Sequence, residues 1–595
     1  MPIATASQAW AILARHARDE IQSLRLQELC QDNHRVSSLV SVQSNDDSTL
    51  IVDFSRQRMT LETLDHLLHL ANACGCIDLM QEELPYHHPP NSLYLALRAP
   101  RGSSMILLPH DSATLATAGA KSTATQSPNQ TPMNACPIVH TEWERVQRIS
   151  EGYRRGQLRG VTGAVLKDVI VVGSGVALHS LRFVYEALMQ DPAGCFASKD
   201  GLAELLTRRT FTTTVIDVGH RRLRMVSSVD TLATAKAIED LDPASTLVIS
   251  LAMTGQEETG LASRLLKNWL HKSLAGGGRK ADLIFSRHML LVTGNDRLYQ
   301  ASKPESVFSV PSFCRSEPFC TLSNMTLLPL AIIFGWNLIH DGLLAGAHNM
   351  DSHMVESNPR HNLPLLLALV DLWNDAFLPS TPGRLVQNFG EAFSGYGSYV
   401  ASLESQVCGG PSQPAFSNSS CGMVLTSTDV YDRSLYQASR MVPFELVTVL
   451  DPPIRREGFP HSEVLHHHDA LLCSLFAHAD ELAVVSNRPS TLLLCGRLNA
   501  YTCGQLIALA EHRSIIKAKL WNMTPLFPTQ AGVALRMART DKLKEDLGKL
   551  VERMRLGEED DEDEETETIS GANLSTATLL SNYAGRTREL RNEPI

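Results

Sequence analysis

The chain is predicted to be an α/β protein built on two parallel sheets that are covered by helices. Two observations favour this class. Short runs rich in Val, Ile and Leu alternate with longer segments whose apolar residues recur at helical spacing. The alternation occurs twice, and 595 residues are enough for two or three cores. Two sandwich domains in tandem are therefore expected, with a helical segment in front of them.

The first 110 residues are predicted to be a helical region that also contributes to the larger domain. Residues 6–33 carry apolar side chains at helical spacing. A short strand in TLIVDF is followed by a helix that is expected to start near Thr60, with Thr60 and Thr63 as caps. Residues 111–138 are rich in Ser, Thr, Ala and Pro without apolar periodicity. They are predicted to be a disordered insertion.

The first α/β domain is predicted over residues 139–320. Its clearest unit is the apolar strand Val169–Val172, a turn containing Gly173 and Gly175, and a helix behind it. A strand that enters a helix through a glycine turn is a common phosphate cradle. The other predicted elements are strands at 212–218, 245–253 and 288–294 and helices at 230–241 and 260–270.

The second α/β domain is predicted over residues 321–551. The longest apolar run, Thr326–Ile339, is short and contains a proline, so it is expected to be buried and not to span a membrane. The predicted strands are 442–450 and 490–498, and the predicted helices are 362–373, 466–482, 502–521 and 530–554.

Charge and cysteine content exclude several classes of function. The formal net charge is −11, but nine acidic residues lie between Glu558 and Glu567, so the rest of the chain carries about −2. Residues 552–595 are expected to form an acidic tail, and neither a nucleic-acid nor a membrane partner is predicted. The 12 cysteines lack metal-finger spacing and no secretory leader is visible, which favours a reducing, cytoplasmic location.

Eight segments resemble, in the same order, motifs of the glucose-6-phosphate isomerase (phosphoglucose isomerase) family. The resemblance extends over roughly residues 5–585 and implies two sugar isomerase (SIS) type α/β/α domains, usually in a homodimer. The segments are VDFSRQRMTLETLDHLLHLA, NSLYLALR, GVTGAVLKDVIVVGSG, SSVD, GAHNMDSHM, NLPLLLALVDLW, PTQAGVALRMA and NLSTATLLSNY.

The resemblance also implies a reaction, the interconversion of glucose 6-phosphate and fructose 6-phosphate. In the family a histidine and a lysine help to open the sugar ring, and a glutamate moves a proton between C1 and C2. An arginine stabilises the enediolate, while a Gly-Gly-Ser turn and a Ser/Thr-rich loop hold the phosphate. No cofactor and no metal are implied.

The phosphate-binding motifs have been altered in this chain. Gly173 and Gly175 match the family's glycine turn, but the following Gly-Ser-Asp is replaced by Val176–Leu178. In the loop that matches SKTFTT, Ala-Met replaces Ser-Lys and only Thr254 is retained. Gly173, Gly175 and Thr254 are therefore interpreted as vestiges of a substrate site, because charge-assisted hydrogen bonds supply most of the hold on a phosphate.

Three catalytic positions of the family are replaced as well. The arginine aligns with Phe319, the glutamate with Gly422 and the lysine with Met537. His461, in HSEVLHHHDALL, aligns with the ring-opening histidine. A competing register around DPPIRREG puts Pro452 at that position, and the histidine is then lost too.

These replacements predict a protein that has lost isomerase activity and acts in binding, regulation or assembly. It would pair as a homodimer or, through His461, complete the site of an active isomerase in a heterodimer; a sugar phosphate is a possible ligand. The alternative is a divergent active glucose-6-phosphate isomerase of glycolysis and gluconeogenesis, with its catalytic groups relocated into a cleft with His461. A third hypothesis makes the insertion and the acidic tail contact segments of a larger assembly.

The run His466–His468 is interpreted as structural. Contiguous histidines on a helix point in different directions, whereas metal ligands on a helix are usually three or four residues apart. No metal site is predicted.

Overall fold

The computed structural model describes residues 8–87, 92–107, 133–191, 193–194, 221–227, 229–253, 257–276, 278–304, 306–311, 318–378, 383–408, 423–427, 442–452, 459–523, 544–545, 547–548 and 579. Residues 1–409 and 414–526 form one compact unit. A second unit comprises residues 410–413 and 527–595. The first unit carries both sheets, so the predicted boundary at residue 320 separates two sheets within one compact body.

The first sheet has five strands in the order β6-β5-β7-β8-β9, and all four neighbouring pairs are parallel. The central strands β5 and β7 are buried along their whole length, as expected for a sheet covered on both faces. The strands are β5 (Asp168–Val172), β6 (Arg222–Val226), β7 (Thr246–Ala252), β8 (Met289–Thr293) and β9 (Val307–Ser309).

The second sheet has six strands in the order β1-β2-β13-β12-β10-β11. The last four are mutually parallel, whereas β2 is antiparallel to both β13 and β1. The N-terminal region therefore contributes the edge of the second sheet. The strands are β1 (Val40–Ser44), β2 (Thr49–Asp53), β10 (Gly383–Phe389), β11 (Met423–Ser427), β12 (Phe444–Val449) and β13 (Ser490–Cys495). A separate short pair joins β3 (Ile106–Leu107) to β4 (Met133–Asn134).

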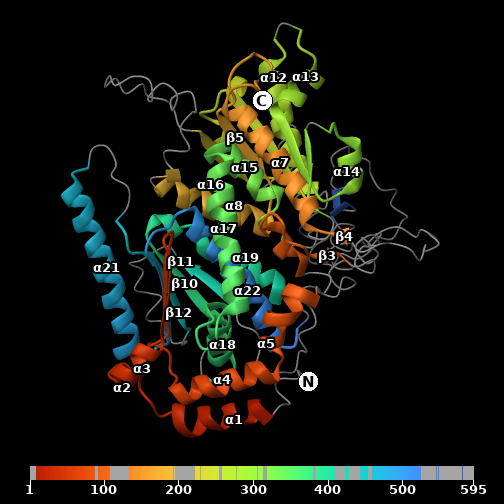
Figure 1. Ribbon diagram of the computed structural model, residues 1–595. Coiled ribbons are helices and arrows are strands. Elements are labelled where there is room, and N and C mark those ends of the chain that lie inside the picture. The colour runs from red at the N-terminus through yellow and green to blue at the C-terminus, as the bar shows by residue number, and fades with distance from the viewer. Residues whose placement is uncertain are drawn as a thin grey trace, which may run out of the picture. The chain divides into compact units, whose positions relative to one another are not determined.

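Helices surround both sheets (Figure 1). The N-terminal ones are α1 (Gln8–His16), η1 (Ala17–Ile21), α2 (Leu26–Leu29), α3 (Asn33–Ser38), α4 (Leu61–Ala73), α5 (Cys76–Asp78), η2 (Leu79–His87) and η3 (Ser92–Leu97). Those around the first sheet are α7 (Cys136–Arg154), α8 (Gly175–Gln190), α11 (Thr231–Ile238), η4 (Pro243–Ser245), α12 (Glu257–Leu274), α13 (Ala281–His288) and α14 (Asp296–Ala301). The remainder are α15 (Asn324–Phe334), α16 (Trp336–Leu338), η6 (Ile339–Leu344), α17 (Ala345–Glu356), α18 (Leu363–Ala376), η7 (Glu391–Phe393), α19 (Tyr396–Cys408), α21 (His461–Val484) and α22 (Ala500–Leu520).

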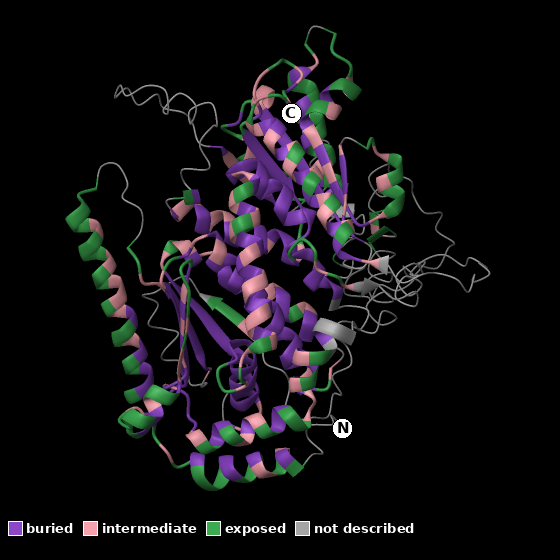
Figure 2. Ribbon diagram, in the orientation of Figure 1, coloured by how far each residue is buried: buried purple, intermediate pink, exposed green. Residues whose placement is uncertain are grey.

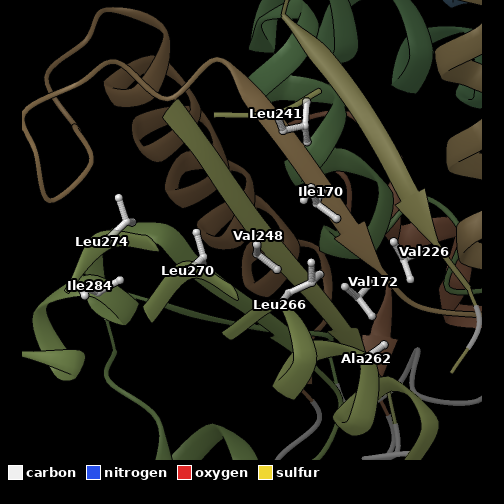
Figure 3. Packing of buried hydrophobic residues seen from close by; sticks show 10 residues of the cluster. All are labelled: Ile170, Val172, Val226, Leu241, Val248, Ala262, Leu266, Leu270, Leu274 and Ile284. Atoms are coloured by element: carbon white, nitrogen blue, oxygen red, sulfur yellow. The ribbon is translucent and has the colours of Figure 1, made fainter. Parts of the chain in front are cut away.

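The core of the first sheet is aliphatic on the face that α12 covers. Side chains of β5, β6 and β7 meet those of α12 and α13 in one cluster (Figure 3). Leu266 and Val248 are fully buried at its centre. Each large aliphatic side chain removed from water in this way contributes about 1.5–3 kcal/mol.

The two sheets are joined by the contact between α8 and α19. At Gly395 the backbone passes so close to Phe183 that an added Cβ would lie 2.8 Å from the Cα of Phe183. Beside this contact the hydroxyl of Ser394 donates a 2.8 Å hydrogen bond to the carboxylate of Glu186. A glycine is required there, and the close approach fixes how α8 lies against the second sheet.

The predicted α/β class with parallel sheets is confirmed, and so is the helix that begins after Thr60. Thr60 and Thr63 form a reciprocal capping box at its start. The apolar run at 326–339 forms the buried helix α15 and the turn after it. None of the described helices is long and apolar enough to cross a lipid bilayer.

The helical segment predicted at 6–33 is present as several short helices. The chain is interrupted after η1, where Arg25 is extended and the guanidinium of Arg58 donates to the carbonyls of Gln22 and Leu24. The predicted strand at 212–218 lies outside the described residues. β6, which was not predicted, lies beside β5, and its Arg222 pairs with Asp168.

The position of the predicted insertion can be compared only at its end. Residues 111–132 lie outside the described part of the chain, whereas residues 133–138 form β4 and the start of α7. Residues 133–138, which were predicted to belong to the disordered insertion, are therefore ordered.

Candidate functional site

The glycine turn after β5 is built as a strand-to-helix junction. β5 is buried throughout, Ser174 is extended at the N-cap, and Gly175 opens α8 with a φ of 74°. That left-handed conformation favours glycine. Gly173 is also constrained, because an added Cβ would lie 3.0 Å from the Cβ of Leu251 on β7. Both glycines are thus explained by the geometry of the turn itself.

The first turn of α8 faces the core. Val176 and Ala177 are fully buried and Leu178 is 5% exposed. At the end of the neighbouring strand β7, Ala252 and Met253 are buried as well. Apolar side chains therefore occupy the first turn of α8, at the positions that the resemblance aligns with the family's phosphate donors.

Phe319 is packed as a core residue. Its side chain is 5% exposed, and its ring lies 5.2 Å from the ring of Tyr94, centroid to centroid. Among the described positions that match the family's phosphate and enediolate groups (173–178, 252–253 and 319), no side chain carries a charge.

Directly behind Phe319 lies a buried polar network, the Arg98 network (Tyr94, Arg98, Asp351, Glu511 and His512). The guanidinium of Arg98 donates to Asp351 at 2.7 and 2.8 Å and also contacts Glu511. His512 Nε2 lies 2.7 Å from Asp351 and its Nδ1 lies 3.0 Å from the hydroxyl of Tyr94. Arg98 ends the NSLYLALR motif and Asp351 lies in GAHNMDSHM, so two motifs 253 residues apart meet here.

The charges in the Arg98 network reinforce one another. Burial disfavours the charged guanidinium, yet the carboxylates of Asp351 and Glu511 outweigh it and raise the pKa of Arg98. Burial alone would raise the pKa of Asp351, but Arg98 and His512 lower it below its usual range. For Glu511 burial dominates and its pKa is raised, while burial lowers the pKa of His512. The network is thus centred on a permanent Arg98–Asp351 ion pair.

A second buried network, the Arg384 network, lies at the amino ends of the second sheet's strands. Arg384 on β10 pairs with Glu404, Asp371 and Glu445 at 2.5, 3.2 and 2.8 Å. Arg513 of α22 shares Asp371 and Glu445. Ligands of parallel sheets bind beyond the opposite, carboxyl ends. We therefore assign this network to the scaffold; it also includes Lys517 and Asp375.

A cavity of about 230 Å³ opens at those carboxyl ends of β10, β12 and β13, and we call it the carboxyl-edge cavity. Glu391, Asp451, His468 and Arg497 contribute polar groups to its lining. Arg497 pairs with the buried Asp191 at 2.8 Å, and His468 Nε2 lies 2.9 Å from the carbonyl oxygen of Leu450. An acid, an imidazole and a guanidinium thus line one hollow.

A larger hollow of about 620 Å³ lies under β7 and β8, against α12, α13 and α14. Its cations are Arg264, Lys267 and Lys303, all of which are exposed. A phosphate bound there would stay hydrated, so the hollow does not reproduce a closed phosphate site.

His461 lies at the end of α21 that is farthest from the buried residues of that helix. It is the exposed first residue of α21, and the buried residues of that helix begin at Leu475. Fourteen residues of helix separate the two, which is about 21 Å along the axis. We call residues 461–474 the free half of α21, and Figure 2 shows that this half of the helix is mostly exposed. His461 does not line the carboxyl-edge cavity, whereas Pro452, the residue of the competing register, does.

The remaining predicted site residues cannot be placed. Thr254, Gly422 and Met537 lie outside the described residues. Of the predicted set, the structure places Gly173 and Gly175 in the turn after β5, Phe319 in the core against Tyr94 and His461 on the surface.

Sequence reasoning missed the carboxyl-edge cavity, although part of the signal was present. Asp451 directly follows the predicted strand 442–450, and Arg497 lies near the end of the predicted strand 490–498. Side chains at the carboxyl ends of parallel strands converge at one edge of the sheet. Glu391 could not be found in this way, because β10 was not predicted. Its sequence, GRLVQNF, carries Arg384, Gln387 and Asn388 and does not resemble an apolar strand.

Fold and motifs together define an α/β protein of the sugar isomerase class. The family model described as phosphoglucose isomerase matches residues 114–486. The chain is 27% identical over 627 residues to a cytosolic glucose-6-phosphate isomerase of Oenothera sinuata var. hirsuta, with 99% of this chain and 97% of the relative covered. A cytosolic glucose-6-phosphate isomerase of Zea mays is 26% identical over 617 residues, with coverage of 97% and 95%.

A solved structure agrees at the level of the fold. The crystal structure of a glucose-6-phosphate isomerase from Chlamydia trachomatis matches with a TM-score of 0.66 at 17% identity, covering 90% of this chain and 95% of that one. The chain belongs to the phosphoglucose isomerase family.

Proposed function

We propose that this member of the phosphoglucose isomerase family does not catalyse aldose–ketose isomerisation and acts instead through binding, regulation or assembly. The observation that carries the proposal is Phe319. At the position where the family has its enediolate-stabilising arginine, this chain packs an aromatic ring against Tyr94. A phenyl ring buried in the core can neither donate to an enediolate nor move into a substrate cleft.

The size of the expected loss supports the proposal. A preorganised charge on the developing oxyanion is worth roughly 10²–10³ in rate, and a positioned general base typically ~10²–10⁴. Such effects are not additive, but the chain has Phe319, Gly422 and Met537 at the arginine, glutamate and lysine positions. None of the three replacements can titrate or carry charge.

The altered turn supports weak substrate binding in addition. With Val176, Ala177 and Leu178 buried at the start of α8, the helix terminus presents apolar side chains to the space where a phosphate would sit. A sugar phosphate is therefore proposed as a weak ligand at most, and Gly173, Gly175 and Thr254 as remnants of its site.

We propose that the protein acts as a dimer, and that the free half of α21 forms the contact between the subunits. Within the described part of the chain no residue of 461–474 is fully buried, Leu465 is 37% exposed and Phe459, just ahead of the helix, is 62% exposed. Exposed apolar side chains beside His461 suit a subunit contact. The partner is a second copy or an active isomerase whose site His461 would complete. Because relatives are named cytosolic, we propose a cytoplasmic location.

The test is the conversion of fructose 6-phosphate to glucose 6-phosphate by the purified full-length protein, with His461→Ala as the control variant. The proposal predicts that neither the wild type nor the variant gives turnover above the protein-free blank. Turnover that disappears in His461→Ala would overturn it. Co-expression with an active isomerase tests the pairing separately, because a chain that forms only homodimers cannot complete another enzyme's site.

A second candidate is a divergent active isomerase whose groups have moved. The carboxyl-edge cavity favours it, because Glu391, His468 and Arg497 line one hollow at the strand ends where α/β enzymes bind ligands. Arg497 is already paired with Asp191, which lowers its availability for an anion. This candidate predicts turnover that Glu391→Gln abolishes and His461→Ala leaves intact, so the same assay separates the two functions.

A further inference from the structure

Two histidines and a glutamate meet where the end of α1 crosses the beginning of α4, two helices that lie side by side in Figure 1. His16 is the last residue of α1, and Glu62 and His66 are one turn apart on α4. One potential ligand atom from each of the three lies within 4.8 Å of the others. The rings of His16 and His66 are 5.1 Å apart, centroid to centroid, and His66 Nε2 is 3.7 Å from Glu62 Oε1.

His16 is oriented by a partner on its other nitrogen. The side chain is 4% exposed, and its Nε2 lies 2.7 Å from the hydroxyl oxygen of Thr63, which the capping box with Thr60 holds in place. Metal-binding histidines are oriented in this way by a hydrogen bond from the nitrogen that does not bind the metal. With the proton on Nε2 donated to Thr63, the lone pair of Nδ1 remains available.

The buried Nδ1 of His16 is not satisfied by the rest of the described chain. It makes no hydrogen bond of acceptable geometry there. Its nearest charged neighbour is the exposed carboxylate of Glu20, 3.1 Å away on the next turn. Glu20 and Glu62 place two carboxylates around two imidazoles, a set of groups that suits a cation at the centre.

We propose that His16, Glu62 and His66 bind a divalent transition-metal ion of the Zn²⁺ type, with Glu20 or water in the fourth position. Zn²⁺ takes imidazole nitrogens and carboxylate oxygens at about 2.0–2.2 Å, and a tetrahedral arrangement puts neighbouring ligand atoms about 3.3–3.6 Å apart. The His66–Glu62 separation is close to that value, and a rotation of the exposed Glu62 side chain closes the rest.

The ion ties α1 to α4 and so stabilises the N-terminal layer against the second sheet. Sequence reasoning predicted no metal site because it considered only the cysteine spacing and His466–His468. The ligands found here are separated by 46 residues between His16 and Glu62, and only the fold brings them together.

The test is Zn²⁺ binding to the chelator-treated full-length protein, measured by competition with a chromophoric chelator. The matched variants are His66→Ala, which removes a half-buried ligand, and His69→Ala, which removes an exposed histidine on the same helix outside the cluster. We expect His66→Ala to weaken the tightest site at least tenfold and His69→Ala to leave it unchanged. Weak binding at His466–His468 is common to all variants and does not affect the comparison.

Two further readouts separate a metal site from a merely structural histidine. Co²⁺ should give the visible absorption of a tetrahedral N/O site in the wild type and not in His66→Ala. Zn²⁺ should raise the melting temperature of the wild type more than that of Glu62→Gln. Equal affinity of the wild type and His66→Ala, or an equal loss in His69→Ala, would overturn the proposal.

Discussion

Two neighbouring parts of the core have opposite character. The Arg98 network keeps a guanidinium, two carboxylates and an imidazole in contact in the buried interior. Tyr94 belongs to this network through its hydroxyl, and its ring packs against Phe319, the residue predicted at the family's arginine position. Charged groups therefore lie on one side of Tyr94 and an apolar ring lies on the other.

The difference reflects what each group holds in place. Arg98 directly follows η3, whereas Asp351 and Glu511 lie in α17 and α22. Removing one of the three leaves the others buried without their partner, which is costly. An arginine that faces a substrate cleft holds no segment together. Under the proposed function, Phe319 at that position adds apolar burial without breaking a structural contact, so the fold depends on the Arg98 network and not on the arginine.

The largest expected effect on stability comes from breaking the Arg98 network. Arg98→Met should lower the free energy of unfolding by about 3–5 kcal/mol, because Asp351 and Glu511 remain buried without their cation. Urea denaturation measures the change. Arg101→Met is the matched control, since Arg101 is 63% exposed in its ion pair with Glu144 and should cost about 0–1 kcal/mol. Equal losses in the two variants would remove the basis of the comparison.

Acid should weaken the Arg384 network, to which Glu404 belongs. Arg384 and Lys517 overcome the effect of burial and lower the pKa of Glu404 from 4.5 to about 2. A lowered folded-state pKa means stability that is present above pH 4.5 and is lost as the pH falls towards 2. The loss for this group is on the order of 3 kcal/mol. Urea midpoints between pH 5 and 2 measure it.

The control for the acid experiment is Glu404→Gln, which keeps the shape of the side chain and removes its titration. The variant should start less stable and lose less between pH 4.5 and 2 than the wild type does. An identical slope in both proteins would assign the acid sensitivity to other carboxyls.

A smaller effect on stability is expected at Phe319, on the apolar side of Tyr94. Phe319→Leu should cost about 1–1.5 kcal/mol, since it removes the ring contact with Tyr94 and keeps most of the apolar volume. The control Phe459→Leu, at 62% exposure, should be close to neutral. A gain of isomerase turnover in Phe319→Leu would show that the ring blocks a working site and does not merely replace a lost one.

The smallest effect on stability is expected at His461, the predicted ring-opening histidine. His461→Ala should change the free energy of unfolding of the isolated chain by less than about 0.5 kcal/mol, because the residue is exposed and α21 buries nothing there. Thermal unfolding in dilute solution checks this, with the buried His512→Ala as the costly counterpart. A stabilising contribution that grows with protein concentration would place His461 in a subunit contact.

The sequence predicts the fold well where patterns are local. Apolar strands such as Val169–Val172 and the capping pair Thr60 and Thr63 determine their own conformation from neighbouring residues. The polar strand β10 was missed, because Arg384 becomes a core residue only when Asp371 and Glu404 arrive from distant helices. Local periodicity cannot reveal a charge that is neutralised by tertiary contacts.

The site was predictable in part for the same reason. Alignment of motifs leads to Phe319 and the glycine turn, and packing explains why each tolerates its residue. The carboxyl-edge cavity and the cluster at His16 depend on segments that are distant in the chain. The resemblance drew attention to residues matching known roles, whereas these groups match none.

The most direct test of the central claim follows proton transfer itself. Fructose 6-phosphate is incubated with the purified full-length protein in D₂O, and solvent deuterium entering C1 is measured by NMR. Each cycle of enediolate formation and return exchanges that proton, even when no net product accumulates. The account predicts incorporation at the rate of the buffer control. Incorporation above that rate, abolished by Glu391→Gln or by His461→Ala, would show that a working base remains and would contradict it.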